Sequence, residues 1–371
     1  MPGRCGSTAS TTPAPIDTPA STVSAGSSRT ASRARRVMVS QPMVSFSAKP
    51  SSRLDAVRPS KRSGVVTRCP AARSRPAKPS SAGRSPSTEW NTTTSVIRRF
   101  CPKCHHGPMA VRATVDVEFA LRVTRPGPAA ISVAAAHADT EELTVSWHGE
   151  SEPVEFGHET RAEVFDLPAG EHRVTYHAER ALTEPEPEPV TLADVAVFTR
   201  PSRYCPSDRI AGLVPPELLK LKSAEKQVHA IVRHVHDRLS YVAGASRPTD
   251  DAVDTLLAGE GVCRDFAHVC ISLCRFLDIP ARYAGVYAPG LAPMDFHAVF
   301  EAAVDGHWYV FDATRLAPRQ TMLRIATGRD AADTAFLATL GCELDFLGST
   351  VFATTDAALP ADDGSGLVVL G

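Results

Sequence analysis

Apolar positions along the chain follow three different patterns. Residues 1–108 show no regular apolar spacing. Between residues 111 and 123 every second residue is apolar, which is the spacing of a β-strand that buries one face. Similar short runs follow, separated by residues that favour turns, so we predict a small β-sandwich-like domain over residues 109–200. Within it, the alternating Glu and Pro of residues 183–189 predict an exposed, stiff linker.

After residue 200 the apolar spacing becomes helical. Ser223 is placed to cap a helix whose apolar stripe runs through residues 228–239. In residues 266–277 apolar side chains recur every three or four positions, which predicts a helix with one buried face. This helix follows directly on a glycine-bounded turn that contains Cys263, and the segment before Pro280 ends it.

Residues 296–312 predict a β-hairpin. Two apolar runs with strand-forming residues flank Asp305-Gly306, which is a favoured two-residue turn. A two-residue loop fixes the register of the two strands, and Asp312 then falls opposite Val299, on the sheet face that His297 shares. His297 and Asp312 are therefore expected to be diagonal neighbours with Cα atoms roughly 7–8 Å apart, a distance that side chains can bridge.

Beyond the hairpin, the pattern is weaker. Residues 322–326 and 344–352 predict strands, and residues 330–340 predict a helix. The tail from Pro360 has no regular spacing, and we expect it to be loose. The whole segment 201–371 is taken as one domain that carries the Cys, the His and the Asp.

Three residues could take part in a reaction: Cys263, His297 and Asp312. In the first turn of a helix, unpaired backbone N–H groups and the helix dipole favour a thiolate, and the same amides can bind an oxyanion. The set predicts a thiol nucleophile, a base and an orienting carboxylate. Asp295 is an alternative third member, and Tyr241 is a candidate oxyanion donor. The simpler interpretations, a cysteine that fills the core and a structural histidine, stay open on the residues alone.

These segments resemble a known family. The run Gly-Val-Cys-Arg-Asp-Phe-Ala at residues 261–267, the run Leu-Asp-Ile-Pro-Ala-Arg-Tyr at 277–283, His297 and residues 308–312 look like the core of bacterial transglutaminase-like proteins. The resemblance is specific over about residues 200–330. One departure is the sequence Phe-His-Ala-Val around the His, where many members have a small residue before it and Trp after the Ala.

The resemblance implies an α+β protein with a papain-like fold, in which a helix bearing the Cys packs on an antiparallel sheet. It implies a Cys-His-Asp triad of Cys263, His297 and Asp312, and acyl transfer on amide bonds through a thioester. Members of the superfamily include transglutaminases, peptidases and peptide N-glycanases. A peptide or amide substrate is expected, and neither a metal nor an organic cofactor is needed.

Charge separates the chain into two unlike parts. Of the 40 Lys and Arg and 41 Asp and Glu, residues 1–108 hold 18 basic and 3 acidic residues, which leaves 22 basic and 38 acidic residues for 109–371. The first part is also rich in Ser, Thr, Pro, Ala and Arg. Such a composition cannot bury enough apolar surface to offset the entropy of ordering, so we expect a disordered, dispensable arm.

Several origins of that arm are consistent with the sequence. The strand pattern begins at once after Met109, so the native chain is expected to start there and the arm to be no part of it. Alternatives are a native disordered arm, an organellar targeting segment and a basic segment that binds nucleic acid or anionic surfaces. Cys101 and Cys104 with His105 and His106 resemble half of a zinc site, but no second pair stands at usable spacing, so no structural metal is expected.

The remaining observations concern compartment and class. There is no run of about 18 or more apolar residues and no secretory signal at Met1 or Met109, so neither a membrane span nor export is expected. Nine Cys, an odd number, fit reduced thiols in the cytoplasm. Two other function classes stay open: a binding module that keeps the fold without turnover, and nucleic-acid binding through the arm. Oligomeric state is not set by the sequence.

Overall fold

The alternation after residue 111 forms the central strand of a sheet. Strand β2 (Arg112–Arg125) buries every second side chain from Ala113 to Val123, and none of these six is more than 3% exposed. Val111, which continues the same alternation, precedes the strand and is 37% exposed. The predicted period of two is therefore confirmed, and it gives β2 one face for the core and one for solvent.

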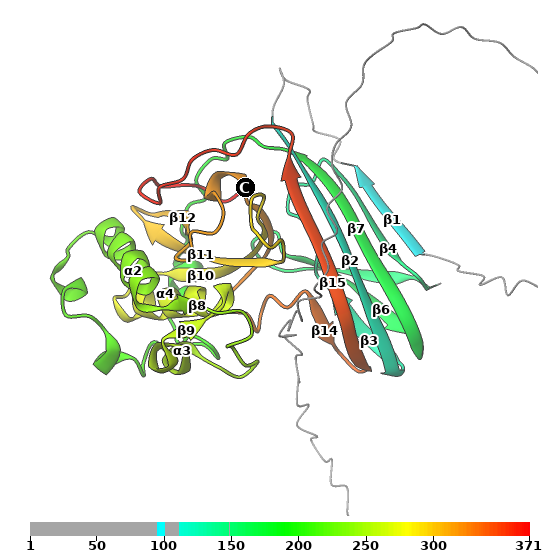
Figure 1. Ribbon diagram of the computed structural model, residues 1–371, viewed down its shortest axis with the longest axis horizontal. Coiled ribbons are helices and arrows are strands. Elements are labelled where there is room, and N and C mark those ends of the chain that lie inside the picture. Colours follow the sequence, from blue (N-terminus) through cyan, green and yellow to red (C-terminus); the bar gives the residue numbers. More distant parts are fainter. Residues whose placement is uncertain (1–94, 101–110, 148) are drawn as a thin grey trace, which may run out of the picture. The chain divides into compact units, whose positions relative to one another are not determined.

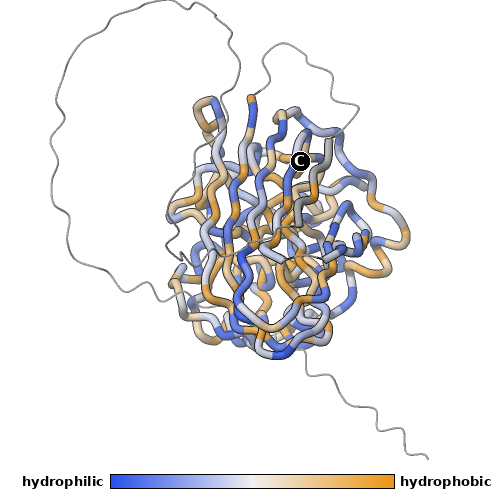
Figure 2. The backbone as a smooth tube through the Cα atoms, turned by 90° about the vertical axis from the view of Figure 1, so that its right-hand side faces the viewer, coloured by the Kyte–Doolittle hydropathy of each residue, from blue (hydrophilic) through white to orange (hydrophobic). Residues whose placement is uncertain are grey.

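The computed structural model describes residues 95–100, 111–147 and 149–371 (Figure 1). All of them belong to one compact unit. In Figure 2, hydrophobic and hydrophilic residues alternate along the strands nearest the viewer. Most of the basic arm, residues 1–94 and 101–108, lies outside the described residues, and so does the half zinc site at 101–106.

Short helices and many strands make up the described unit. The strands are β1 (Ser95–Phe100), β2 (Arg112–Arg125), β3 (Gly127–Ile131), β4 (Thr140–Val145), β5 (Ser151–Glu155), β6 (Arg161–Leu167), β7 (Gly170–Ala181), β8 (Ser240–Tyr241), β9 (Glu260–Gly261), β10 (Ala281–Tyr287), β11 (His297–Val304), β12 (His307–Phe311), β13 (Leu323–Gly328), β14 (Leu337–Thr339) and β15 (Glu343–Thr355). The helices are α1 (Leu192–Phe198), α2 (Ala224–Arg238), α3 (Ala252–Ala258) and α4 (Cys263–Phe276), with 3₁₀ turns at Ala211–Leu213, Leu218–Lys220 and Arg319–Thr321.

Two antiparallel sheets share the first core. Their strand orders are β1-β4-β7-β2-β15 and β14-β3-β6-β5. The buried cluster between them contains Phe119 of β2, Phe165 of β6 and Tyr176 of β7. It also includes Tyr287 of β10 and Leu323 of β13, so the sheet that contains β10 and β13 packs against these two sheets. The Tyr287 hydroxyl donates to the Val133 carbonyl at 2.6 Å, which satisfies the buried phenol at this contact.

The second core holds the Cys-bearing helix. Sheet β12-β11-β10-β13 is antiparallel, and α4 packs on β10 and β11 while α2 and α3 pack on α4. The buried apolar face of α4 includes Val269, Leu273 and Cys274, as the three- and four-residue spacing predicts. Thus the α+β class, with a helix on an antiparallel sheet next to a β-sandwich, is confirmed. Ser223 caps α2 as predicted, since its side chain accepts from the Lys226 amide.

A buried ionic cluster ties the strands of this second sheet together. Glu301 of β11 accepts from Arg282 of β10 at 2.8 Å and from Arg324 of β13 at 2.6 Å. Burial alone raises the pKa of Glu301, but the two guanidinium groups hold that pKa well below its usual range. Arg282 also pairs with Glu188 and lies 4.2 Å from the centre of the Trp308 ring. The carboxylate of Glu301 is thus fully compensated, which its burial requires.

Residues 183–189 dock on the hairpin rather than extending freely. Glu188 takes part in the ionic cluster, and the Trp308 amide donates to the Glu188 carbonyl at 2.9 Å. The next segment forms α1, which the apolar pattern did not predict. Thr191 begins it with a reciprocal capping pair, because its hydroxyl accepts from the Asp194 amide and the Asp194 carboxylate accepts from the Thr191 amide.

The C-terminal strands return to the first two sheets. The sequence analysis assigns residues 201–371 to a single domain, whereas β15 pairs with β2 over almost its whole length and β14 pairs with β3. β15 can join because β2 offers a free, strongly alternating edge beside it. The β-sandwich is therefore built from both ends of the described chain, and the sheet with the hairpin lies between them in the sequence.

The predicted helix at 330–340 is wrong. In its place are a turn and strand β14. The cause is local: the Asp330 carboxylate accepts from the Ala332 amide at 2.9 Å, and Asp333 pairs with Arg329 at 2.8 Å. Aspartate side chains that bind nearby amides compete with helical hydrogen bonds.

The expectation of a loose tail from Pro360 is also wrong. Asp362 pairs with Arg319 at 2.8 Å, and a β-bridge joins Val368 to Val310. Leu370 is only 4% exposed. Isolated ion pairs and apolar residues anchor this segment, and they leave no periodic pattern in the sequence.

The structure also corrects the expected extent of the arm. Residues 95–100 form β1, which pairs antiparallel with β4 at the edge of the five-stranded sheet.

A chain that begins at Met109 should still fold, because β1 covers only one edge. We expect it to melt a few degrees below a chain that begins at Thr94, since about 1 kcal/mol corresponds to roughly 2–4 °C in a protein of this size. Calorimetry of the two chains measures the difference. Equal melting temperatures would show that β1 adds nothing, and failure to fold from Met109 would show that the arm is essential.

Candidate active site

Two glycines shape the turn before the candidate nucleophile. Gly259 ends α3 with φ +76°, a left-handed conformation that glycine adopts without strain. Gly261 lies against Asp265, and a Cβ atom there would come within 2.8 Å of the Asp265 Cβ. The chain therefore turns from α3 through β9 into α4 within four residues, and Cys263 becomes the first residue of α4, as predicted.

The N-cap residue of α4 provides no side-chain cap. Val262 occupies the N-cap position and has no polar side chain to fill it. Asp265 accepts from the Val262 amide at 2.9 Å and pairs with Arg264 at 2.8 Å, and both charged side chains are buried. Arg264 in turn donates to the Arg247 carbonyl at 2.7 Å. The start of the helix is thus held from outside the turn, and the Cys263 amide interacts with the Tyr241 hydroxyl.

Exposure distinguishes Cys263 from the other cysteines of α4. Cys263 is partly exposed, whereas Cys270 and Cys274 are fully buried. Burial raises the pKa of both Cys270 and Cys274, which keeps them as neutral thiols. Cys270 and Cys274 are therefore core residues, and Cys263 is the α4 thiol that a substrate can reach.

The hairpin brings His297 and Asp312 together. Its register agrees with the prediction, with Val304 opposite His307 across the Asp305–Gly306 turn. His297 donates from Nε2 to Asp312 Oδ2 at 2.9 Å, and both side chains are buried. The diagonal contact that turn chemistry predicts is therefore present in the structure.

Asp312 is fixed by groups that the sequence analysis missed. Its second oxygen, Oδ1, accepts from the Thr314 amide at 2.8 Å and from the Thr314 hydroxyl at 2.7 Å. Between them, the Ala313 carbonyl accepts from His236 Nδ1 of α2 at 2.9 Å. An Asp followed two residues later by Thr is a recognisable Asp-initiated turn, so the Thr314 contact had a signal. The His236 contact, between distant segments, had none.

The charge of Asp312 dominates the titration of His297. Burial by itself lowers the pKa of His297, but the negative charge and hydrogen bond of Asp312, with a further contribution from Cys263, raise it to about 10. Burial likewise raises the pKa of Asp312, yet the contacts with His297 and Thr314 leave that pKa below its usual value. Since Nε2 is bound, Nδ1 is the nitrogen open to Cys263, and it is buried with no hydrogen-bond partner in the described part of the chain.

Tyr241 lies beside the same turn. β8 pairs in parallel with β9, so Tyr241 is opposite Gly261, two residues before Cys263. Burial raises the pKa of Tyr241, and the Cys263 thiol raises it further while the Cys263 amide opposes the shift. The phenol is 45% exposed and its ring centre lies 6.1 Å from that of Phe266. The structure thus brings the candidate oxyanion donor to Cys263.

Asp295 does not orient the histidine. Although it was an alternative third member, His297 Nε2 is bound to Asp312. Asp295 Oδ1 instead accepts from the Phe296 amide at 2.8 Å, and the residue is exposed. The carboxylate stays near the site, because it raises the pKa of Tyr241 and its own pKa is affected by His297.

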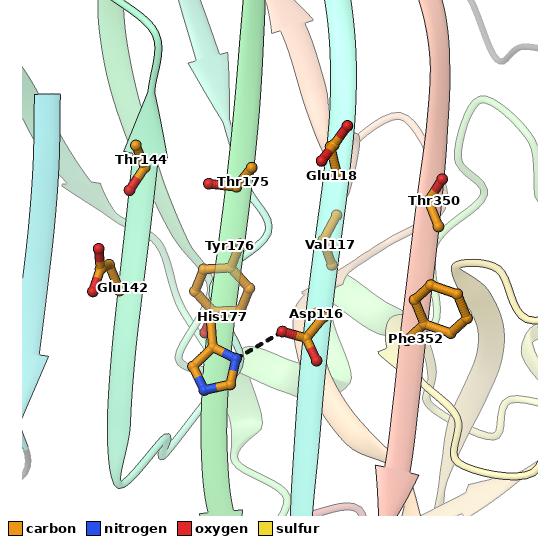
Figure 3. A pocket seen from close by; sticks show the side chains of 10 residues that line it. All are labelled: Asp116, Val117, Glu118, Glu142, Thr144, Thr175, Tyr176, His177, Thr350 and Phe352. Atoms are coloured by element: carbon orange, nitrogen blue, oxygen red, sulfur yellow. Dashed lines mark hydrogen bonds and ion pairs between the residues drawn. The ribbon is translucent and has the colours of Figure 1, made fainter. Parts of the chain in front are cut away.

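The five-stranded sheet has a surface hollow that is separate from Cys263, His297 and Asp312. A shallow hollow of about 370 Å³ opens on the solvent face of the five-stranded sheet, lined by strands β2, β4, β7 and β15 (Figure 3). Two of its charged side chains already pair, His177 with Asp116 at 2.7 Å. Within the described ranges, no three His, Cys, Asp or Glu side chains are grouped to hold a metal ion. No helix there is long and apolar enough to cross a membrane.

Comparisons with known proteins agree with this geometry. The sequence model of the transglutaminase-like superfamily matches residues 216–313, a range that includes Cys263, His297 and Asp312. An uncharacterized protein of Mycobacterium leprae is 27% identical over 158 residues, which are 39% of this chain and 57% of the relative, so the chain spans little more than half the length of that relative.

Similar solved structures include the following two. The periplasmic domain of TgpA from Pseudomonas aeruginosa is 14% identical with a TM-score of 0.33, covering 53% of this chain and 87% of its own. A structure from Cytophaga hutchinsonii, described as a candidate cysteine protease, is 31% identical with a TM-score of 0.63 and covers 73% of this chain and 98% of its own. With that identity over nearly the whole relative, the chain belongs to the transglutaminase-like superfamily.

Proposed function

We propose that this protein is a cysteine-dependent acyltransferase or hydrolase that acts on amide bonds through a thioester. One observation carries the proposal: a buried histidine is bound at Nε2 by Asp312, and its Nδ1 is left open to the partly exposed thiol of Cys263. In the described part of the chain, ring nitrogens without a hydrogen-bond partner also occur at His172, His229 and His268, but His297 combines one with a carboxylate on its other nitrogen and with a thiol that affects its pKa. An open nitrogen coupled to a thiol is the arrangement that proton transfer needs.

The proposed reaction has two halves. His297 Nδ1 takes the proton of Cys263, and the thiolate sulfur attacks the amide carbonyl. The carbon–nitrogen bond then breaks, the amine leaves with the proton from His297, and a thioester remains on Cys263. Water or a second amine attacks the thioester with His297 again as base. Asp312 holds the ring tautomer and stabilises the imidazolium, and the Cys263 amide with Tyr241 binds the oxyanion.

Several properties follow from this proposal and from the composition. The substrate is a peptide or another amide, and no step calls on a metal or an organic cofactor. All five cysteines in the described part of the chain are free thiols, which supports the cytoplasm as the proposed compartment. Whether water or an amine resolves the thioester determines hydrolysis or transfer, and partition of the acyl-enzyme in the presence of added amine measures it.

Acylation by an activated ester tests the proposal. p-Nitrophenyl acetate should release a burst of p-nitrophenolate and leave an acetyl group on Cys263 of the intact protein. Cys263→Ala should abolish the burst with little loss of stability, and His297→Ala should reduce it almost as far, because members of a catalytic unit are not additive. Cys274→Ala, in the same helix but fully buried, is the matched control and should keep the burst.

The opposite outcome has a definite meaning. If Cys263 is not acetylated and His297→Ala changes nothing, the protein is a binding module that keeps the fold without turnover.

The His297–Asp312 pair should also make stability depend on pH. The pKa of His297 in the folded protein, about 10, lies above the ordinary value of 6.5, so the folded state holds the proton more tightly. This stabilisation is complete below about pH 6.5 and is lost as the pH rises through 10. Asp312→Asn should therefore lower the free energy of unfolding by about 3–5 kcal/mol near pH 6. The loss should shrink towards pH 10. Urea unfolding at both pH values measures it, and an equal loss at both would contradict the pairing.

Tyr241 provides a separate test of the oxyanion site. Tyr241→Phe removes the hydroxyl and keeps the ring contact with Phe266. If the hydroxyl binds the oxyanion, the acylation rate should fall by about 10²–10³-fold. Tyr309→Phe, at a half-buried tyrosine of β12, should change the rate little. Loss of less than about threefold in Tyr241→Phe would remove Tyr241 from the oxyanion site.

A further inference from the structure

Asp295 is an exposed carboxylate at the edge of the candidate active site. It lies two residues before His297, the first residue of β11, so chain connectivity holds the two Cα atoms within about 7 Å of each other. Its carboxylate accepts a local hydrogen bond from the Phe296 amide at 2.8 Å. Among the residues that the structure describes, no Lys or Arg forms an ion pair with it. The carboxylate is therefore uncompensated at a position that a substrate can reach.

The surroundings of Asp295 place it near the thiol. Its charge raises the pKa of Tyr241. The thiol of Cys263 also raises that pKa, and the Cys263 amide lowers it. The charge of His297 in turn lowers the pKa of Asp295. Tyr241, Cys263, Asp295 and His297 thus influence one another electrostatically, which places the Asp295 carboxylate near the thiol and the imidazole.

The position relative to His297 identifies the side of the substrate that Asp295 faces. In the proposed reaction, His297 gives its proton to the leaving amine and later takes one from the attacking amine or water. The amine side of the scissile bond must therefore lie next to the imidazole. Asp295, two residues before His297, is placed to line that side. A carboxylate there attracts a positive charge and repels a negative one.

We propose that Asp295 determines specificity on the amine side, by binding a cationic group carried by the amine that leaves or attacks. The inference rests on the proposed function. Two substrates share this chemistry: a peptide with a basic residue directly after the scissile bond, and a diamine acceptor whose second amine is protonated. The attacking nitrogen itself must be neutral, so the charge that Asp295 binds belongs to a second group.

Charged thiol reagents test the carboxylate without a known substrate. Cys263 is treated with 2-(trimethylammonium)ethyl methanethiosulfonate, a cation, and with 2-sulfonatoethyl methanethiosulfonate, an anion. In each case the thiolate attacks the sulfenyl sulfur, a disulfide forms and methanesulfinate leaves. The readout is the ratio of the two rates within each protein, so changes in thiol reactivity that affect both reagents equally cancel.

The expected result is a shift in that ratio. Asp295→Asn should lower the cation-to-anion ratio by on the order of tenfold at low salt, and less at high salt, because the interaction is screened. Asp295→Glu should keep most of the preference. Asp237→Asn, which removes the charge of an exposed aspartate on α2, is the matched control and should leave the ratio unchanged. An unchanged ratio in Asp295→Asn would overturn the inference.

Turnover then distinguishes the two sources of the cation. Faster acyl transfer to 1,4-diaminobutane than to butylamine, lost in Asp295→Asn, assigns the site to the acceptor. Faster hydrolysis of a peptide with lysine after the scissile bond than with norleucine, also lost in Asp295→Asn, assigns it to the leaving group. If Cys263 is acylated normally but neither preference exists, this inference fails alone. If Cys263 is not acylated at all, the proposed function fails instead.

Discussion

The register of the hairpin β11–β12 is the constraint on which the candidate site depends. The turn residues Asp305 and Gly306 both have positive φ, 48° and 82°, as a tight two-residue turn of this kind requires. That turn sets Val304 opposite His307 and, through the ladder, places Asp312 within reach of His297. A slip of one residue would turn every side chain of a strand to the other face, and the imidazole would lose its carboxylate.

Cys263 is positioned by a different set of contacts. Gly259 and Gly261 bring the chain into α4, and the buried pair of Arg264 and Asp265 holds the first turn from outside. Packing of α4 on β10 and β11 then brings Cys263 close enough to affect the pKa of His297. In the same sheet, Glu301 and its two arginines link β10, β11 and β13. A rigid sheet under a rigid helix start is what a preorganised catalytic group needs.

Most of this site could be predicted from local sequence signals. The Gly-bounded turn, the helical spacing after Cys263 and the two-residue hairpin loop each depend on neighbouring residues, and each local rule agreed with the fold. What escaped prediction depends on contacts between distant segments. The His236 bond to the Ala313 carbonyl and the return of β15 to β2 have no local signal.

The wrong predictions have a related cause. Asp330 and Asp333 bind nearby groups in a turn, which outweighed the weak helical spacing of residues 330–340. The tail beyond Pro360 is held by the ion pair of Asp362 with Arg319, and a single ion pair leaves no periodicity to read.

The central claim is that Cys263 and His297 act as one chemical unit. The most direct measurement is the rate of alkylation of Cys263 by iodoacetamide near pH 6, followed by mass spectrometry, in the native sequence and in His297→Ala. At that pH an ordinary thiol is almost wholly protonated and reacts slowly, whereas a thiolate paired with an imidazolium reacts quickly. The account predicts that Cys263 is alkylated at least about tenfold faster than glutathione, and that His297→Ala removes the difference. Equal rates for Cys263 and glutathione, or no effect of His297→Ala, would contradict it.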